Sequence, residues 1–341
     1  AAYEAMGKMA MEMRLARVDI FKPPPNPNAS NITSKKAKAK VEEELKRDTN
    51  KEIKAIIFAH VLGNPPDMHR LMNLVKQYNL IFLEDACDAL GSTYDGKKLG
   101  SFGLMSTCSF FPAHHMTTGE GGFVATNSRA VRSTVASFRD WGRACFCNEM
   151  KPGDVTASTA CGDRFKEWLP GCPKAVYDHR YVFDEIGYNI KPLDLQAAIG
   201  LEQLKKLPDM DRARRENFKK LYDIFKPYED YFYLPKATEK ADPCWFGFLL
   251  VTKPSAPFKK QEFVRHMEKA KIQTRSYFTG NALYHPAYQE MAKDYDDLDA
   301  KFPNAHVVTM GSVFLGTYIG LSDEKIEYIK KTVNNFFEGL E

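Results

Sequence analysis

Residues 53–85 read IKAIIFAHVLGNPPDMHRLMNLVKQYNLIFLED, a stretch in which two short apolar runs enclose one helical pattern. The runs at residues 53–60 and 80–83 are typical of buried strands, and apolar side chains recur at helical spacing from residue 66 to residue 78. A strand, a helix and a second strand in this order form a crossover unit whose strands are parallel. The stretch therefore predicts an α/β fold.

The pattern continues on both sides of a predicted domain boundary near Pro227. This boundary divides the chain into residues 1–227 and residues 228–341. In the first part we expect strands at 109–111 and 123–125, a helix from Ser128 to Trp141, a long ordered loop at 145–181, a helix at 193–207 ended by Pro208, and a helix at 211–225. In the second part we expect a strand at 245–252, a helix at 261–270 and a terminal helix after Ser322, which together make a small α+β unit.

Charge and composition exclude several classes of function. The 341 residues are 44% hydrophobic, and 48 basic side chains are nearly balanced by 44 acidic ones. A net charge of +4 is too small to favour nucleic acid or an anionic membrane as the main partner. No apolar run approaches the roughly 18 residues that span a bilayer, and residues 1–17 do not resemble a signal peptide. We therefore expect a globular cytoplasmic protein.

Cysteine usage indicates metal binding or burial rather than disulfides. Seven cysteines are an odd number, and the chain shows no secretory signal. Cys87 and the later Cys145, Cys147 and Cys161 could ligate an iron–sulfur cluster or zinc, although small buried cysteines are common. Cys172 competes with Cys161 as a ligand. Cys108 and Cys244 are expected to be buried.

One aspartate directly follows a predicted strand. Asp85 comes after the run at 80–84, and in open parallel sheets ligands bind beyond the carboxyl ends of the strands. The same residue could instead cap a turn.

Two motifs resemble a known family. They are Glu84-Asp85-Ala-Cys-Asp-Ala-Leu-Gly91 and Ser109-Phe-Phe-Pro-Ala-His114-His115-Met-Thr-Thr-Gly119-Glu-Gly-Gly122. Together they resemble the cofactor site of the DegT/DnrJ/EryC1/StrS sugar aminotransferase family, pyridoxal-phosphate enzymes that act on nucleotide-linked keto sugars. In the aminotransferases of that family a lysine stands at the position of His114. The resemblance implies fold type I, with a mainly parallel central sheet, helices on both faces and a small α+β C-terminal domain.

The resemblance also implies roles for individual residues. Asp85 would keep the pyridine nitrogen of the cofactor protonated, and Ser109 would bind its phosphate. No lysine lies between Leu99 and Met150, so the cofactor would be held as free pyridoxamine phosphate, with His114 as the base. Asp88 would orient His114 or the cofactor. His115 is the rival base, although the spacing from Ser109 selects His114.

The cysteine segment resembles that of the 3-dehydrase of this family that acts on nucleotide-linked 4-keto-6-deoxyhexoses and carries a 2Fe-2S cluster. It implies Cys87, Cys145, Cys147 and Cys161 as ligands, with a longer last interval than the family has. Asn189 resembles an asparagine that reaches the cofactor phosphate of the neighbouring subunit, which implies a homodimer. Four residues in the second part resemble the stretch near the sugar nucleotide or border the pocket: Trp245, Phe246, Arg275 and Asn281.

The implied activity is C3 dehydration of a nucleotide-linked 4-keto-6-deoxyhexose, of the CDP-4-keto-6-deoxyglucose type. Electrons would reach the cluster from an NAD(P)H-dependent flavin iron–sulfur reductase, and the product would be a 3,6-dideoxy sugar for lipopolysaccharide or a related glycoside. Two alternatives stay open: a cluster-free dehydratase of the same family and a non-catalytic regulatory or scaffold protein. The resemblance fades before Ile53, where the family has a Gly-Ser phosphate loop and an aromatic residue that stacks on the cofactor. We therefore expect the N-terminal portion of the cofactor-binding domain to be missing.

Overall fold

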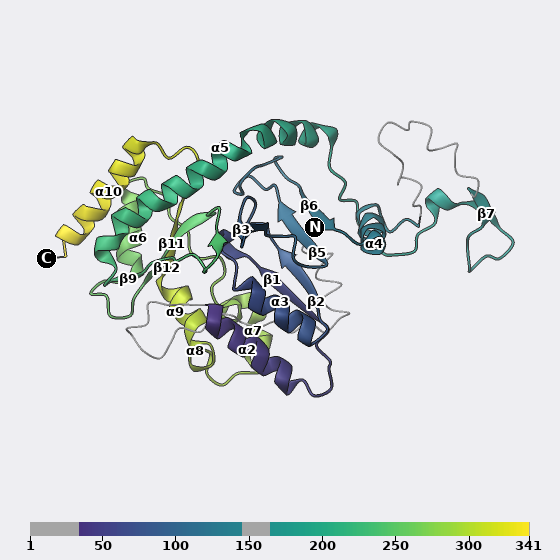
Figure 1. Cartoon of the computed structure of the whole chain (residues 1–341), viewed down its shortest axis with the longest axis horizontal. Helices are drawn as coiled ribbons and strands as arrows, with labels where there is room; N and C mark the ends of the chain where they lie inside the picture. The colour runs from purple at the N-terminus through teal and green to yellow at the C-terminus, as the bar shows by residue number, and fades with distance from the viewer. Residues whose placement is uncertain (1–33, 145–163, 341) are drawn as a thin grey trace.

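Four strands form the central sheet of the computed structural model, which describes residues 34–144 and 164–340 (Figure 1). Their order is β1 (Ala55–Ala59), β2 (Ile81–Asp85), β5 (Met105–Ser109) and β6 (Gly122–Thr126). β1, β2 and β5 are parallel, whereas β6 runs antiparallel to β5. The predicted mainly parallel sheet is confirmed. Asp85 and Ser109 both lie at the carboxyl ends of their strands.

Helices cover both faces of this sheet because neighbouring side chains of β2 point to opposite sides. Phe82 faces α2 (Ser34–Arg47) and α3 (Met68–Gln77), where it packs in one buried cluster. Leu83 faces the opposite side of the sheet and belongs to a second apolar cluster, which includes side chains of α4 (Arg129–Arg139). Asp67 and Ser128 begin α3 and α4 by accepting backbone N–H groups, as N-cap residues do.

The prediction of two helices separated at Pro208 is wrong. One helix of 32 residues, α5 (Asp194–Phe225), continues through this exposed proline. Proline removes one helical hydrogen bond and its ring crowds the preceding turn. Tertiary packing offsets that cost, since the last turns of α5 bury Leu221 and Phe225 in the core of the C-terminal unit. Figure 1 shows α5 passing from the central sheet to the side of α10.

The C-terminal unit is an antiparallel sheet covered by helices, as expected. Its strands lie in the order β12 (Ser312–Gly316), β11 (Gly247–Thr252) and β9 (Phe232–Tyr233). α6 (Lys260–Lys269) and α10 (Asp323–Glu338) pack on it through a core rich in phenylalanine. Shorter helices complete this part of the chain: α7 (Gln289–Ala292), α8 (Leu298–Lys301) and α9 (Pro303–Gly311).

A small sheet joins segments from the two sides of the predicted boundary. β10 (Ala241–Asp242) pairs with β3 (Thr93–Tyr94), which also pairs with β4 (Lys97–Lys98). The segment after β10 then contacts the backbone of Leu62 and the side chain of His115 before β11 begins. The boundary near Pro227 stays a prediction.

Within the predicted ordered loop at 145–181, the described part forms a hairpin. β7 (Phe165–Glu167) pairs with β8 (Val176–Asp178), and Arg164 and Arg180 both bond the carboxylate of Asp178. No helix within residues 34–144 and 164–340 is long and apolar enough to cross a bilayer.

Candidate active site

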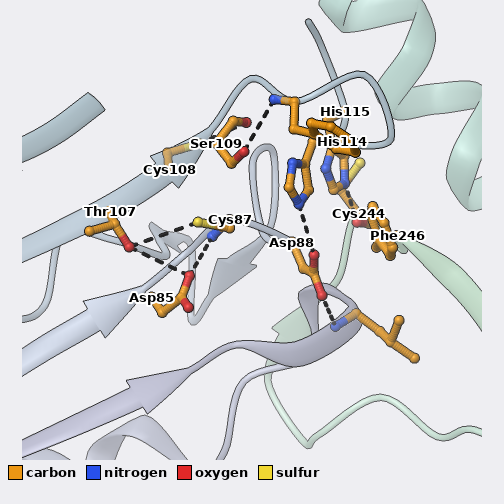
Figure 2. Close-up of polar contacts among 12 residues, drawn as sticks. Asp85, Cys87, Asp88, Thr107, Cys108, Ser109, His114, His115, Cys244 and Phe246 are labelled. Carbon is orange, nitrogen blue, oxygen red and sulfur yellow. Dashed lines mark hydrogen bonds and ion pairs between the residues drawn. The ribbon is translucent and has the colours of Figure 1, made fainter. Parts of the chain in front are cut away.

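Asp85 is held at the end of β2 by two contacts (Figure 2). Asp85 is only 8% exposed, and its Oδ1 accepts the backbone N–H of Cys87 at 3.1 Å. The hydroxyl of Thr107, its neighbour in the β2–β5 register, lies 3.5 Å from the same oxygen. The structure thus fixes a buried carboxylate at the sheet edge where the sequence predicted a ligand site.

Asp88 and His114 form a pair next to this carboxylate (Figure 2). One oxygen of Asp88 accepts the backbone N–H of Leu62 at 3.1 Å, and the other lies 3.4 Å from Nε2 of His114. The two side chains are only 13% and 17% exposed. If the imidazole is neutral and its Nε2 donates to this carboxylate, the lone pair of His114 is on Nδ1. Nδ1 is buried and has no hydrogen-bond partner among the described residues.

Aromatic rings enclose the imidazole of His114. The ring of Phe246 lies 5.4 Å away and that of Phe111 lies 6.3 Å away, measured between centroids. Phe246 also lies 6.5 Å from Phe278. Its backbone N–H donates to Leu62, so it is tied to the turn that also binds Asp88. His114 therefore lies in a mainly apolar environment with one carboxylate.

His115 has a structural role and is not paired with Asp85 or Asp88. Its Nε2 donates to the carbonyl of Cys244 at 2.7 Å, and the residue is 3% exposed (Figure 2). Burial, and then the charge of Arg214, lowers the pKa of His115 to about 3. The neutral ring joins the His114 loop to the segment that leads into β11.

Ser109 lies at the same edge of the sheet as Asp85. Its Oγ accepts the backbone N–H of Phe111 at 3.1 Å, which leaves the hydroxyl proton available to an acceptor (Figure 2). This orientation suits the predicted contact with a phosphate, although phosphate binding by Ser109 stays a prediction.

Of the four predicted cluster ligands, only Cys87 is among the described residues. Its Sγ lies 3.8 Å from the hydroxyl of Thr107, and burial together with the charge of Asp85 raises the pKa of the thiol. Cys145, Cys147 and Cys161 lie outside the described residues. Within the ranges that the structure describes, no three His, Cys, Asp or Glu side chains are grouped as metal ligands. Cys172 is exposed, and Cys108 and Cys244 are buried as expected.

The predicted substrate residues differ in where they lie. Trp245 is 6% exposed and stacks on Phe218 at 3.9 Å, so most of its ring packs in the core, and its place at the border of a substrate pocket stays a prediction. Arg275 is exposed and pairs through its backbone with Phe314. Asn281 is buried and caps a short turn by accepting the N–H of Leu283. Its position next to the sugar nucleotide stays a prediction.

Asn189 is not part of the contacts around Asp88. It is exposed, and its backbone forms a β-bridge with Asp140, directly after α4. A contact with a neighbouring subunit stays a prediction.

Two residues near the site gave no signal in the sequence. Burial, and then the charge of Asp88, raises the pKa of the Tyr277 hydroxyl. Arg214 is 5% exposed, and its guanidinium lies 3.4 Å from the carbonyl of His114. An arginine in a charged helical pattern is ordinarily a surface residue, so only the fold could reveal it.

The donor set fits pyridoxal or pyridoxamine phosphate. Asp85 offers a fixed carboxylate to a pyridine nitrogen, Ser109 offers a hydroxyl proton, and Nδ1 of His114 is buried without a hydrogen-bond partner among the described residues. A mainly parallel sheet covered on both faces, with a small antiparallel unit behind it, is the architecture of the fold type I pyridoxal-phosphate enzymes.

Comparison with known proteins identifies the family. The chain belongs to the DegT/DnrJ/EryC1/StrS aminotransferase family, whose profile matches residues 24–334. It is 38% identical to the lipopolysaccharide biosynthesis protein RfbH of Salmonella typhimurium over 83% of this chain and 63% of that protein. It is also 38% identical to the dTDP-4-dehydro-2,6-dideoxy-D-glucose 3-dehydratase of Saccharopolyspora spinosa, over 86% of this chain and 61% of that protein. The chain therefore spans about six-tenths of the length of these relatives.

A solved structure supports the same fold. The Escherichia coli GDP-4-keto-6-deoxy-D-mannose-3-dehydratase with bound hydrated PLP superposes with a TM-score of 0.67 and 29% sequence identity. The match covers 85% of this chain and 69% of that one.

Proposed function

We propose that this protein catalyses the C3 dehydration of a nucleotide-linked 4-keto-6-deoxyhexose with pyridoxamine phosphate and with His114 as the base. The Asp88–His114 pair supports this proposal, because Nδ1 of His114 is buried without a partner among the described residues, and the sequence resemblance aligns this histidine with the family's lysine. Two of the similar proteins described above are named as sugar-nucleotide 3-dehydratases.

Each residue of the site has a role in this proposal. Bound pyridoxamine phosphate would supply an amine and a ring that accepts electrons. Asp85 holds the pyridine nitrogen, and Ser109 donates to the phosphate. His114 accepts a proton at Nδ1, and Asp88 stabilises the resulting positive charge through Nε2. The surrounding aromatic rings keep water from the imidazole.

The proposal is tested with the complete gene product, pyridoxamine phosphate and a panel of nucleotide-linked 4-keto-6-deoxy sugars. Mass spectrometry should detect loss of water at C3 for at least one sugar. His114→Asn should abolish this reaction while cofactor absorbance is retained, and full turnover by that variant would show that another group is the base. An unchanged panel would favour the alternative of a non-catalytic regulatory or scaffold protein.

We further propose that the complete site includes a 2Fe-2S cluster held by Cys87, Cys145, Cys147 and Cys161. An NAD(P)H-dependent flavin iron–sulfur reductase would supply its electrons, and a CDP-linked sugar would be the substrate. The position of Cys87, whose N–H binds Asp85, supports a cluster beside the cofactor. Since burial favours the protonated thiol, the metal has to displace that proton on binding.

Iron and labile sulfide analysis of anaerobically purified protein separates this proposal from a cluster-free dehydratase, which would release the amine hydrolytically. Cys87→Ser and Cys145→Ser should each lower the iron content, while Cys108→Ser, a buried cysteine outside the proposed set, should not. Cys172→Ser decides whether Cys172 replaces Cys161 as the fourth ligand. Unchanged iron in Cys87→Ser would exclude that ligand.

We also propose that the protein is a homodimer in which Asn189 serves the site of the neighbouring subunit. The first half of α5 supports this with several exposed apolar side chains, which a partner would cover. They are Leu195, Ile199, Leu201 and Leu204. Sedimentation should give a dimer, and Leu201→Glu should shift it toward the monomer; a wild-type monomer at micromolar concentration would refute the proposal.

A further inference from the structure

The side chain of Arg214 joins segments that are far apart in the sequence. This arginine lies on the second half of α5 and is 5% exposed. Its Nη1 donates to the carbonyl of Phe246 at 3.1 Å and lies 3.4 Å from that of Trp245. Its Nη2 lies 3.4 Å from the carbonyl of His114. One planar guanidinium thus bonds the backbones of both residues whose rings face each other in the site.

Neighbouring contacts make this junction rigid. Thr317, at the end of β12, donates its hydroxyl to the carbonyl of Trp245 at 2.7 Å and also lies 3.4 Å from Arg214. Asn217, one turn further along α5, donates to the carbonyl of Tyr318 at 3.0 Å. Two buried side chains of α5 therefore hold the His114 loop, the segment before β11 and the segment after β12 against one helix.

We propose that Arg214 is a positioning residue, which sets His114 against Asp88 and Phe246 without touching the reacting atoms. The 5.4 Å separation of the His114 and Phe246 rings depends on two carbonyls that share its guanidinium. The inference rests on the proposed function, because it assigns Arg214 to the same reaction. A lysine at this position would keep the positive charge, but its ammonium group cannot bond three carbonyls in one plane as a guanidinium can. The Arg214→Lys substitution therefore separates the contribution of geometry from that of charge.

The activity test uses Arg214→Lys and Arg214→Met in the complete protein loaded with pyridoxamine phosphate. We expect kcat to fall about 100-fold in both, with KM changed less than about threefold, as a small displacement of a catalytic group does. Arg212→Met is the exposed control, since the partner of Arg212 within the described part of the chain is Asp209 on the same helix. Arg215→Met is the matched control, because Arg215 joins Gly91 and Asp242 but not the His114 loop.

The outcomes of this test are distinct. A kcat within about threefold of wild type in Arg214→Met overturns the inference. An equal loss in Arg215→Met, compared at matched thermal stability, also overturns it, because it would show a general effect of removing an arginine from α5. Recovery of wild-type kcat in Arg214→Lys would show that charge, not geometry, is what Arg214 supplies.

A second test needs no turnover. Diethyl pyrocarbonate labelling with peptide mapping compares how fast His114 and the surface residue His69 are modified in each variant. With its loop released, His114 should be labelled at least about threefold faster in Arg214→Met, while His69 is unchanged. An unchanged His114 rate overturns the inference. If the wild-type protein dehydrated no sugar, the proposed function would fail while this labelling experiment still decided the role of Arg214.

Discussion

Replacing Asp88 with Asn is the most direct test of the carboxylate–histidine pair. The carbonyl of the amide would accept the backbone N–H of Leu62, as the carboxylate does at 3.1 Å. Its NH2 group would then face Nε2 of His114, which has to become an acceptor. The proton moves to Nδ1, so the nitrogen proposed as the base loses its lone pair. The substitution therefore removes a charge and imposes the wrong tautomer.

The size of the charge effect follows from the 3.4 Å separation of Nε2 and the carboxylate. Coulomb's law gives about 1 kcal/mol at the dielectric constant of water and about 5 kcal/mol at an effective value of about 20. The low exposure of both side chains places the pair nearer the second value. We therefore expect kcat to fall about 100- to 1,000-fold, before the tautomer effect is added.

The assay is single-turnover dehydration, with cofactor binding followed by absorbance. Asp88→Asn should bind pyridoxamine phosphate with little change, because Asp85 remains. Asp95→Asn is the matched control, since Asp95 contacts His69 at 2.8 Å in an exposed pair away from the site. A rate in Asp88→Asn within about threefold of wild type would refute the role of Asp88.

Two further predictions concern stability, measured as the free energy of unfolding. The pKa of about 3 for His115 in the folded protein lies below its ordinary value of about 6.5. As the pH falls, this histidine therefore takes up a proton in the unfolded chain before it does so in the folded protein. The free energy of unfolding should fall by roughly 1.5 kcal/mol from pH 6.5 to pH 5. His115→Gln keeps a donor for Cys244 but cannot titrate, so it should flatten this pH dependence; an unaltered slope would assign the effect to another group. Pro208→Ala restores a helical N–H and should raise stability by about 1–3 kcal/mol, measured by urea unfolding. A lower stability would contradict a helix that is continuous through residue 208.

Local patterns predicted the part of the molecule that is built from neighbouring residues. The bounds of β1, β2 and α3 fall within a few residues of expectation, because burial and helical spacing are local signals. Asp85 and His114 were found through one continuous motif each, and the structure brings Asp88 of the first motif to 3.4 Å from His114 of the second.

Contacts between distant segments were not predictable in the same way. In the sequence, Pro208 predicts the end of a helix. The helix continues because packing of its last turns in the C-terminal core offsets the free-energy cost of the proline, and this packing involves distant residues. The stacking of Trp245 on Phe218 of α5 is likewise a contact between separate segments of the chain. The pairing of β3 with β10 and the buried position of Arg214 depend on where the chain returns after α5, which no short pattern specifies.

The length of α5 has a mechanical consequence. A helix of 32 residues is about 48 Å long. Near its start, Gln196 donates to the carbonyl of Glu120 in the glycine loop before β6, while its end is buried among the helices of the C-terminal unit. A tilt of that unit would therefore be transmitted along α5 to the 119–122 turn, so the two parts of the protein would move together rather than as independent bodies.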